Sequence, residues 1–115
     1  MGHLFRYNLK LKSLNLENFD TSLITDMTGM FEGCGSLKSL NLSNFKTAKV
    51  ITMWCMFCGS SIQFLDLSSF DTSSVNSMNQ MFMNCKSLLS LKIDNFNTKS
   101  VEDMREMFEN CSSLI

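Results

Sequence analysis

A block of the form Met-x-x-Met-Phe returns four times in this chain, and no other feature restricts the fold as strongly. The copies begin at Met27, Met53, Met78 and Met104. Leucine-type residues repeat in step with them, spaced by 26, 25, 26 and 26 residues, at Leu11, Leu37, Ile62, Leu88 and Leu114. A period of this length indicates stacked copies of one supersecondary unit, none of which buries its apolar face alone.

We treat the chain as a single repeat domain, because its 115 residues are one domain's worth and no linker interrupts the period. It divides into a partial repeat and candidate tag remnant at 1–10, complete repeats at 11–36, 37–61, 62–87 and 88–113, and the start of a further repeat at 114–115. Neither end supplies a polar capping repeat. We therefore expect the ends to fray or to associate end to end with another copy.

The composition is that of an ordinary soluble protein, with 44% hydrophobic and 18% charged residues. A formal net charge of −1 and a pI near 5.7 give no electrostatic reason to expect a nucleic-acid or anionic-membrane partner. No apolar run approaches the roughly 18 residues of a membrane span, and the first residues do not form a secretory signal. If the parent protein is exported, its signal lies outside this chain.

Each unit begins with Leu-x-x-Leu-x-Leu, whose alternation is typical of a short strand with one buried face. The pattern predicts strands near 13–17, 39–43, 64–68 and 90–94. Stacked units would bring these strands together as a parallel sheet, with neighbours about 4.8 Å apart.

The Met-Phe block has a different period. Ile24, Met27, Met30, Phe31 and Cys34 fall at i, i+3, i+6, i+7 and i+10, which predicts one face of a helix of under about two turns. Residues suited to a helix N-cap precede each block, at Asp26, Thr52, Ser77 and Asp103. Residues that favour the left-handed conformation at a helix C-terminus follow it, at Gly33, Gly59, Asn84 and Asn110.

These two elements predict an α/β fold, a right-handed leucine-rich-repeat solenoid of about 26 residues per repeat. A parallel β-sheet would form one face and short helices the other. Met and Phe columns would pack between them.

Segments 11–16 (LKSLNL), 37–45 (LKSLNLSNF) and 65–75 (LDLSSFDTSSV) carry a family resemblance. The chain resembles the BspA-like leucine-rich-repeat surface proteins, in their mycoplasma-type surface lipoprotein repeat branch, over residues 4–115. The resemblance implies a cell-surface or secreted parent protein that binds proteins or mediates adhesion. It implies no enzyme activity, no cofactor and no catalytic residue.

Alternation along the strands places mostly small polar residues on the concave face of the sheet: Ser13, Asn15, Glu17, Ser39, Asn41, Ser43, Phe64, Asp66, Ser68, Ser90, Lys92 and Asp94. Phe64 interrupts a column of Ser, while Asp66 and Lys92 replace Asn. If this face binds a protein partner, we expect Phe64, Asp66 and Lys92 to carry specificity, with Asn41 and Asn15 beside them. The alternative is a solvated sheet face without a partner.

A second candidate surface lies on the predicted convex side. Cys55 and Cys58 stand outside the Cys column, and a helix that buries the intervening Met and Phe would point both thiols outward with Trp54. Met83 aligns with Cys58 one unit later. Three alternatives are open for this patch: a protein contact, a thiol-redox or soft-metal site, and repeat drift without a role.

The other Met and Cys positions that recur along the repeats are predicted to lie in the hydrophobic core. Met-x-x-Met near Cys suits Cu(I) by ligand type, but these Met share a face with Phe and are better explained as packing. Cys34, Cys85 and Cys111 occupy one column and are predicted to be buried free thiols. With His3 as the single histidine, no catalytic constellation and no zinc ligand set is present, so we expect no enzyme, no metal and no cofactor.

Overall fold

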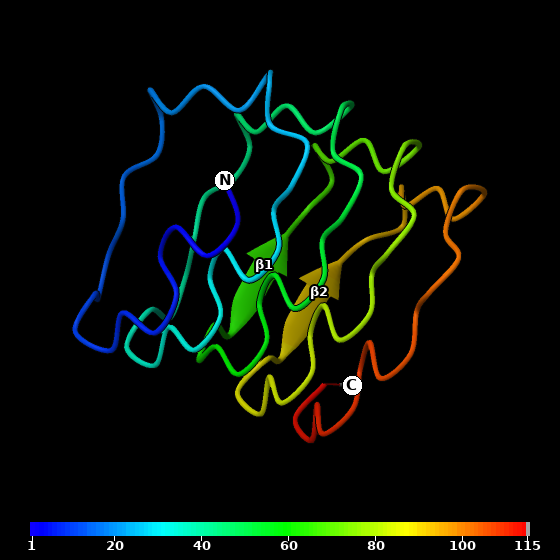
Figure 1. Ribbon diagram of the computed structural model, residues 1–115. Coiled ribbons are helices and arrows are strands. Elements are labelled where there is room, and N and C mark those ends of the chain that lie inside the picture. Colours follow the sequence, from blue (N-terminus) through cyan, green and yellow to red (C-terminus); the bar gives the residue numbers. More distant parts are fainter. Residues whose placement is uncertain (115) are drawn as a thin grey trace.

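The computed structural model describes residues 1–114, so Ile115 in the predicted repeat start at 114–115 lies outside the described residues. The chain winds into successive coils that follow one another in sequence order (Figure 1). Backbone positions 25 or 26 residues apart pair in parallel, at Asp26 with Thr52, Thr52 with Ser77 and Ser77 with Asp103. The period read from the sequence is therefore the length of one coil.

Two strands form the sheet, β1 (Phe64–Asp66) and β2 (Ser90–Lys92), which pair in parallel and lie side by side in Figure 1. They confirm, in shorter form, the strands predicted at 64–68 and 90–94. At 39–43 the pairing is reduced to one bridge from Ser39 to Phe64, and within the described residues 13–17 are not a strand.

Side-chain hydrogen bonds explain why the strands are short. The Oδ1 atoms of Asn15, Asn41 and Asp66 each accept the backbone N–H two residues later, at 2.9–3.0 Å. An amide held in such an Asx-turn cannot continue a strand ladder. Extended pairing is therefore limited after Asn15, Asn41 and Asp66, the polar residues at the centre of the first three Leu-x-Leu patterns.

The predicted helices are wrong, and with them the α/β fold class, because no residue of 1–114 is helical. Alternate amides of the Met-Phe block donate to the next coil. Over distances of 2.8–3.0 Å, Met27, Gly29, Phe31 and Gly33 donate to the carbonyls of Thr52, Trp54, Met56 and Cys58. Two of the intervening amides close β-turns three residues back, as Met30 does on Met27 and Glu32 does on Gly29. No i→i−4 helical ladder can coexist with this pattern.

Left-handed backbone marks two positions in every coil, such as Gly29 at φ 58° and Gly33 at φ 67°. Each is the third residue of a β-turn, the position at which a type II turn requires positive φ. The left-handed conformation predicted at Gly33, Gly59, Asn84 and Asn110 is confirmed, although it completes a turn rather than a helix. The same conformation recurs at His3, Cys55, Gln80 and Glu106, where sequence reasoning did not expect it.

The residues read as helix caps also have another role. The side chains of Asp26 and Asp103 accept the backbone N–H two residues later, at 2.8 and 3.0 Å, and Thr52 does so at 3.3 Å. Asp, Ser and Thr favour such local turns for the same reason that they favour N-caps, since a short polar side chain reaches a nearby amide. Residue type alone therefore does not distinguish the two structures.

The inward positions were predicted correctly in the first three copies of the block, whereas in the last copy Met104 and Phe108 are 45% and 42% exposed. Met27, Met30, Phe31 and Cys34 are fully buried, because consecutive turns and a helix both return residues three or four apart to one side. The aromatic rings stack from coil to coil with centroids 5.5–5.6 Å apart, in the series Phe5, Phe31, Phe57, Phe82 and Phe108. A second series, with centroids 6.1–6.2 Å apart, runs through Phe19, Phe45 and Phe70.

The cysteine column lies beside this core. Cys34 and Cys85 are buried free thiols, as predicted, whereas Cys111 is only partly covered. Burial raises the pKa of Cys85 to about 12. Each thiol donates to a backbone carbonyl of the preceding coil, as Cys85 does to Phe57 at 3.0 Å, so the column contributes to coil stacking.

Polar ladders complete the stacking. The Thr21 hydroxyl donates to the Lys46 carbonyl and accepts the Lys46 N–H, and the pattern recurs at Thr47 and Thr72. Asn44 and Asn95 donate to carbonyls of the preceding coil. Across the described residues, no helix has the length and apolarity required to cross a membrane.

We predict that Phe57→Ala or Phe82→Ala lowers the free energy of unfolding by about 3 to 5 kcal/mol, because each deletes a buried ring from the stack. Urea denaturation followed by circular dichroism measures the loss. Phe64→Ala, at an exposed ring, is the matched control and should change stability by less than about 1 kcal/mol. A loss below about 1 kcal/mol at Phe57 and Phe82 would contradict the buried stack.

A second prediction separates turns from helices at Glu106, an exposed residue at φ 55° within a predicted helix. Gly should be more stable than Ala there by about 1 kcal/mol, since a Cβ strains left-handed backbone. In a helix, Ala would be more stable than Gly by about 1 kcal/mol. Urea unfolding of Glu106→Gly and Glu106→Ala gives the sign of the difference between their free energies of unfolding. Glu109, exposed and without positive φ, is the control position at which Ala should be the more stable.

Candidate functional site

The sheet face carries the larger of two candidate sites. A recess of about 420 Å³ lies over β1 and β2, and we call it the sheet groove. Its lining includes Asn41, Ser43, Phe64, Asp66, Ser90 and Lys92. All twelve side chains that alternation placed on this face are exposed, so the orientation of the strands was predicted correctly.

Phe64 is the most unusual residue in the sheet groove. Its side chain is 57% exposed, although it sits in β1 between coils. Its partners in the neighbouring coils are Ser39 and Ser90, which are too small to cover a ring. The groove therefore presents an aromatic surface with open space on both sides.

One opposite-charge pair lies beside the ring. Asp66 and Lys92 are directly paired across β1 and β2, with Nζ and Oδ2 3.6 Å apart. Hydrogen bonds from Ser68, and then the nearby Lys92, lower the pKa of Asp66. Both side chains are well exposed, so the pair contributes little to stability and its charges are accessible to a partner.

The structure separates the other predicted sheet-face residues. Asn41 lines the sheet groove, whereas Asn15 lines a neighbouring recess of about 240 Å³ that also includes Asn41 and Ser43. Because both Asn side chains already accept a backbone N–H, their first role is in the turn. Asn15 is therefore not brought together with Phe64, Asp66 and Lys92.

The second site contains the residues of the predicted convex patch. Trp54, Cys55, Cys58 and Met83 line one pocket of about 190 Å³, which we call the cysteine pocket. Sequence reasoning missed its other lining residues, which are His3, Arg6, Thr28, Glu32 and Gln80. The four patch residues do come together, as predicted.

The exposure predicted for the two cysteines is wrong. Cys55 and Cys58 are only 8% and 7% exposed, while Trp54 is 47% exposed. Both thiols lie outside the central hydrophobic cluster and line the pocket, so they do turn away from the core. Neighbouring coils cover them because turns joined by an inter-coil ladder lie closer together than packed helices would.

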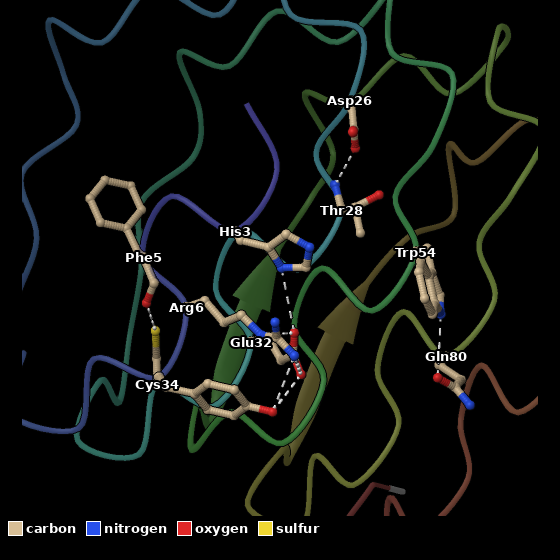
Figure 2. Close-up of polar contacts among 10 residues, drawn as sticks. His3, Phe5, Arg6, Asp26, Thr28, Glu32, Cys34, Trp54 and Gln80 are labelled. Carbon is tan, nitrogen blue, oxygen red and sulfur yellow. Dashed lines mark hydrogen bonds and ion pairs between the residues drawn. The ribbon is translucent and has the colours of Figure 1, made fainter.

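A buried carboxylate forms one wall of the cysteine pocket. Glu32 is 8% exposed and binds the Arg6 guanidinium, with Nε and Oε2 2.7 Å apart, and accepts from the Tyr7 hydroxyl at 2.8 Å. His3 Nδ1 lies 3.8 Å from the same carboxylate (Figure 2). Arg6 and Glu32 occupy equivalent positions in successive repeats, as do Cys58 and Met83 in the next two. Opposite charges at positions one period apart could therefore have indicated this ion pair from the sequence.

Trp54 forms the opposite wall, and a polar chain fixes its ring. The indole Nε1 donates to Gln80 Oε1 at 3.3 Å, as Figure 2 shows. Gln80 Nε2 in turn donates to Glu106 in the next coil. The aromatic wall is thus held by Gln80 and Glu106, which lie one period apart in the sequence.

The two thiols influence each other's ionisation. Interaction with the Cys58 side chain, followed by burial, raises the pKa of Cys55. The hydrogen bond from Cys55 lowers the pKa of Cys58. Within residues 1–114, no group of three or more His, Cys, Asp or Glu side chains could hold a metal ion, which leaves this pair as a two-ligand arrangement.

Comparison with known proteins places the chain in a family. No curated protein and no solved structure matches it. A family model with the description "Mycoplasma protein of unknown function, DUF285" matches residues 1–115, which is the whole chain. The chain therefore belongs to the DUF285 family of Mycoplasma proteins of unknown function.

Proposed function

We propose that this chain is a non-enzymatic protein-binding module that uses the sheet groove, and that its parent is an adhesive cell-surface protein. The observation that carries the proposal is the exposed Phe64 ring in the groove, beside the Asp66–Lys92 pair. The exposed ring provides apolar area for contact with a partner, and the two charges favour one orientation of that partner.

Aromatic side chains in partly enclosed positions are frequent hot spots of protein interfaces, because they bury a large area for little conformational entropy. Ser39 and Ser90 leave room on both sides of the ring for a partner side chain. A negative and a positive charge at fixed positions favour one orientation of a bound segment.

The surface location and the adhesive role have separate support. They follow from the resemblance of segments 37–45 and 65–75 to BspA-like surface proteins, whose members bind proteins or mediate adhesion. The groove supports the binding role from its own chemistry, since it presents an exposed aromatic ring beside two charged side chains.

Peptide-display selection on the whole chain, followed by calorimetry with the selected peptides, tests the proposal. We expect Phe64→Ala to weaken binding by about 30-fold or more, since a hot spot contributes about 2 kcal/mol or more. Lys92→Glu should weaken the binding of peptides that carry an acidic residue, because it replaces an attractive charge with a repulsive one. Leu23→Ala removes another exposed apolar side chain, 78% exposed and outside the groove, and should leave binding unchanged.

Peptides that bind Phe64→Ala and Lys92→Glu as tightly as the unaltered chain would refute a role for the groove. Circular dichroism and the urea midpoint show that each variant keeps its fold, which is expected because both residues are exposed.

A further inference from the structure

We propose that Cys55 and Cys58 form a binding site for a soft monovalent metal ion, with Cu(I) as its representative, held between the two sulphur atoms. The site is separate from the sheet groove, and the inference does not depend on the proposed protein-binding role. It assigns a ligand to a pocket that the proposed function leaves unused.

The backbone brings the two sulphurs together. The Cys58 N–H donates to the Cys55 carbonyl at 3.2 Å, which closes a β-turn from Cys55 to Cys58. The ends of such a turn lie within about 7 Å of each other. Cys55 has φ 54°, and both residues line the cysteine pocket rather than joining the core cluster. One tight turn thus presents two thiols to one space.

The donor set selects the class of ion. Thiolate and thioether sulphur favour Cu(I), and the Met83 thioether lines the same pocket. A tetrahedral zinc site needs four ligands, and the described residues offer no cluster of three or more acidic, His or Cys side chains for a metal ion. A soft ion that accepts two-coordinate linear geometry is therefore the one that this pair fits.

The pocket walls suit a small ion. Arg6 neutralises the Glu32 carboxylate with Nε and Oε2 2.7 Å apart, so that wall carries no uncompensated charge. Trp54, held by Gln80, shields the opposite side. The pocket of about 190 Å³ leaves the thiols mostly covered, which limits competition from water and larger thiol compounds.

The binding step balances without a change of oxidation state. Two S–H bonds break and two Cu–S bonds form, so Cu(I) and two neutral thiols give an anionic bis-thiolate complex and two protons. The protons pass to the solvent. The affinity must therefore fall as pH decreases, because protons compete with the ion for both sulphurs.

Anaerobic titration of the whole chain with Cu(I) against a chromogenic Cu(I) chelator tests the site. We expect one ion per chain and release of about two protons per ion in a weakly buffered solution. Cys55→Ser and Cys58→Ser should each weaken binding by more than about 100-fold, because even a residue that only supports a ligand changes affinity by about 10- to 100-fold.

Cys111→Ser is the matched control, because it alters a free, partly covered thiol in a different column and should keep full affinity. Binding by Cys55→Ser or Cys58→Ser equal to that of the unaltered chain would overturn the site, as would failure of the unaltered chain to take Cu(I) from the chelator. X-ray absorption of the loaded, unaltered chain gives an answer even if a serine variant unfolds. Two or three sulphur neighbours support the pair, whereas nitrogen neighbours would assign the ion to His3.

Discussion

The hydrogen-bond ladder between the Met-Phe blocks is the constraint on which the rest of the structure depends. The blocks that begin at Met27, Met53 and Met78 direct every second amide to the next coil and close β-turns with most of the others. Turns such as Met27–Met30 satisfy few backbone groups by themselves, but stacking supplies the missing partners. Because the ladder fixes coil-to-coil register, the Phe rings, Thr hydroxyls and Cys thiols can each form their own series.

Register has a direct consequence for the surface, because a residue lies beside its equivalents one coil away. Asp66 meets Lys92 in this way on the sheet face, and Arg6 meets Glu32 at the cysteine pocket. In a stack of coils, a site is therefore made by departures from the repeat in neighbouring units. Phe64 in a column of serines is the simplest example.

The two candidate sites differ in burial, and this difference determines what each can bind. The sheet groove is open, with Phe64 and both charges exposed, so it suits a large partner. The cysteine pocket is narrow and covers Cys55 and Cys58 almost completely, so it suits a small ion. Family membership leaves the function of either site open, since the family description assigns none.

The sequence by itself determined the period, the columns that are buried in the first three Met-Phe blocks, and the twelve exposed sheet-face positions, because the side of the chain on which a residue lies follows from its spacing. Only the tertiary structure decided between a helix and stacked turns, since Met27, Met30 and Phe31 lie inward in both. A two-turn helix is marginal, and amides that pair between coils are satisfied more completely. The same ladder draws neighbouring coils over Cys55 and Cys58, and no property of a single unit could show that burial.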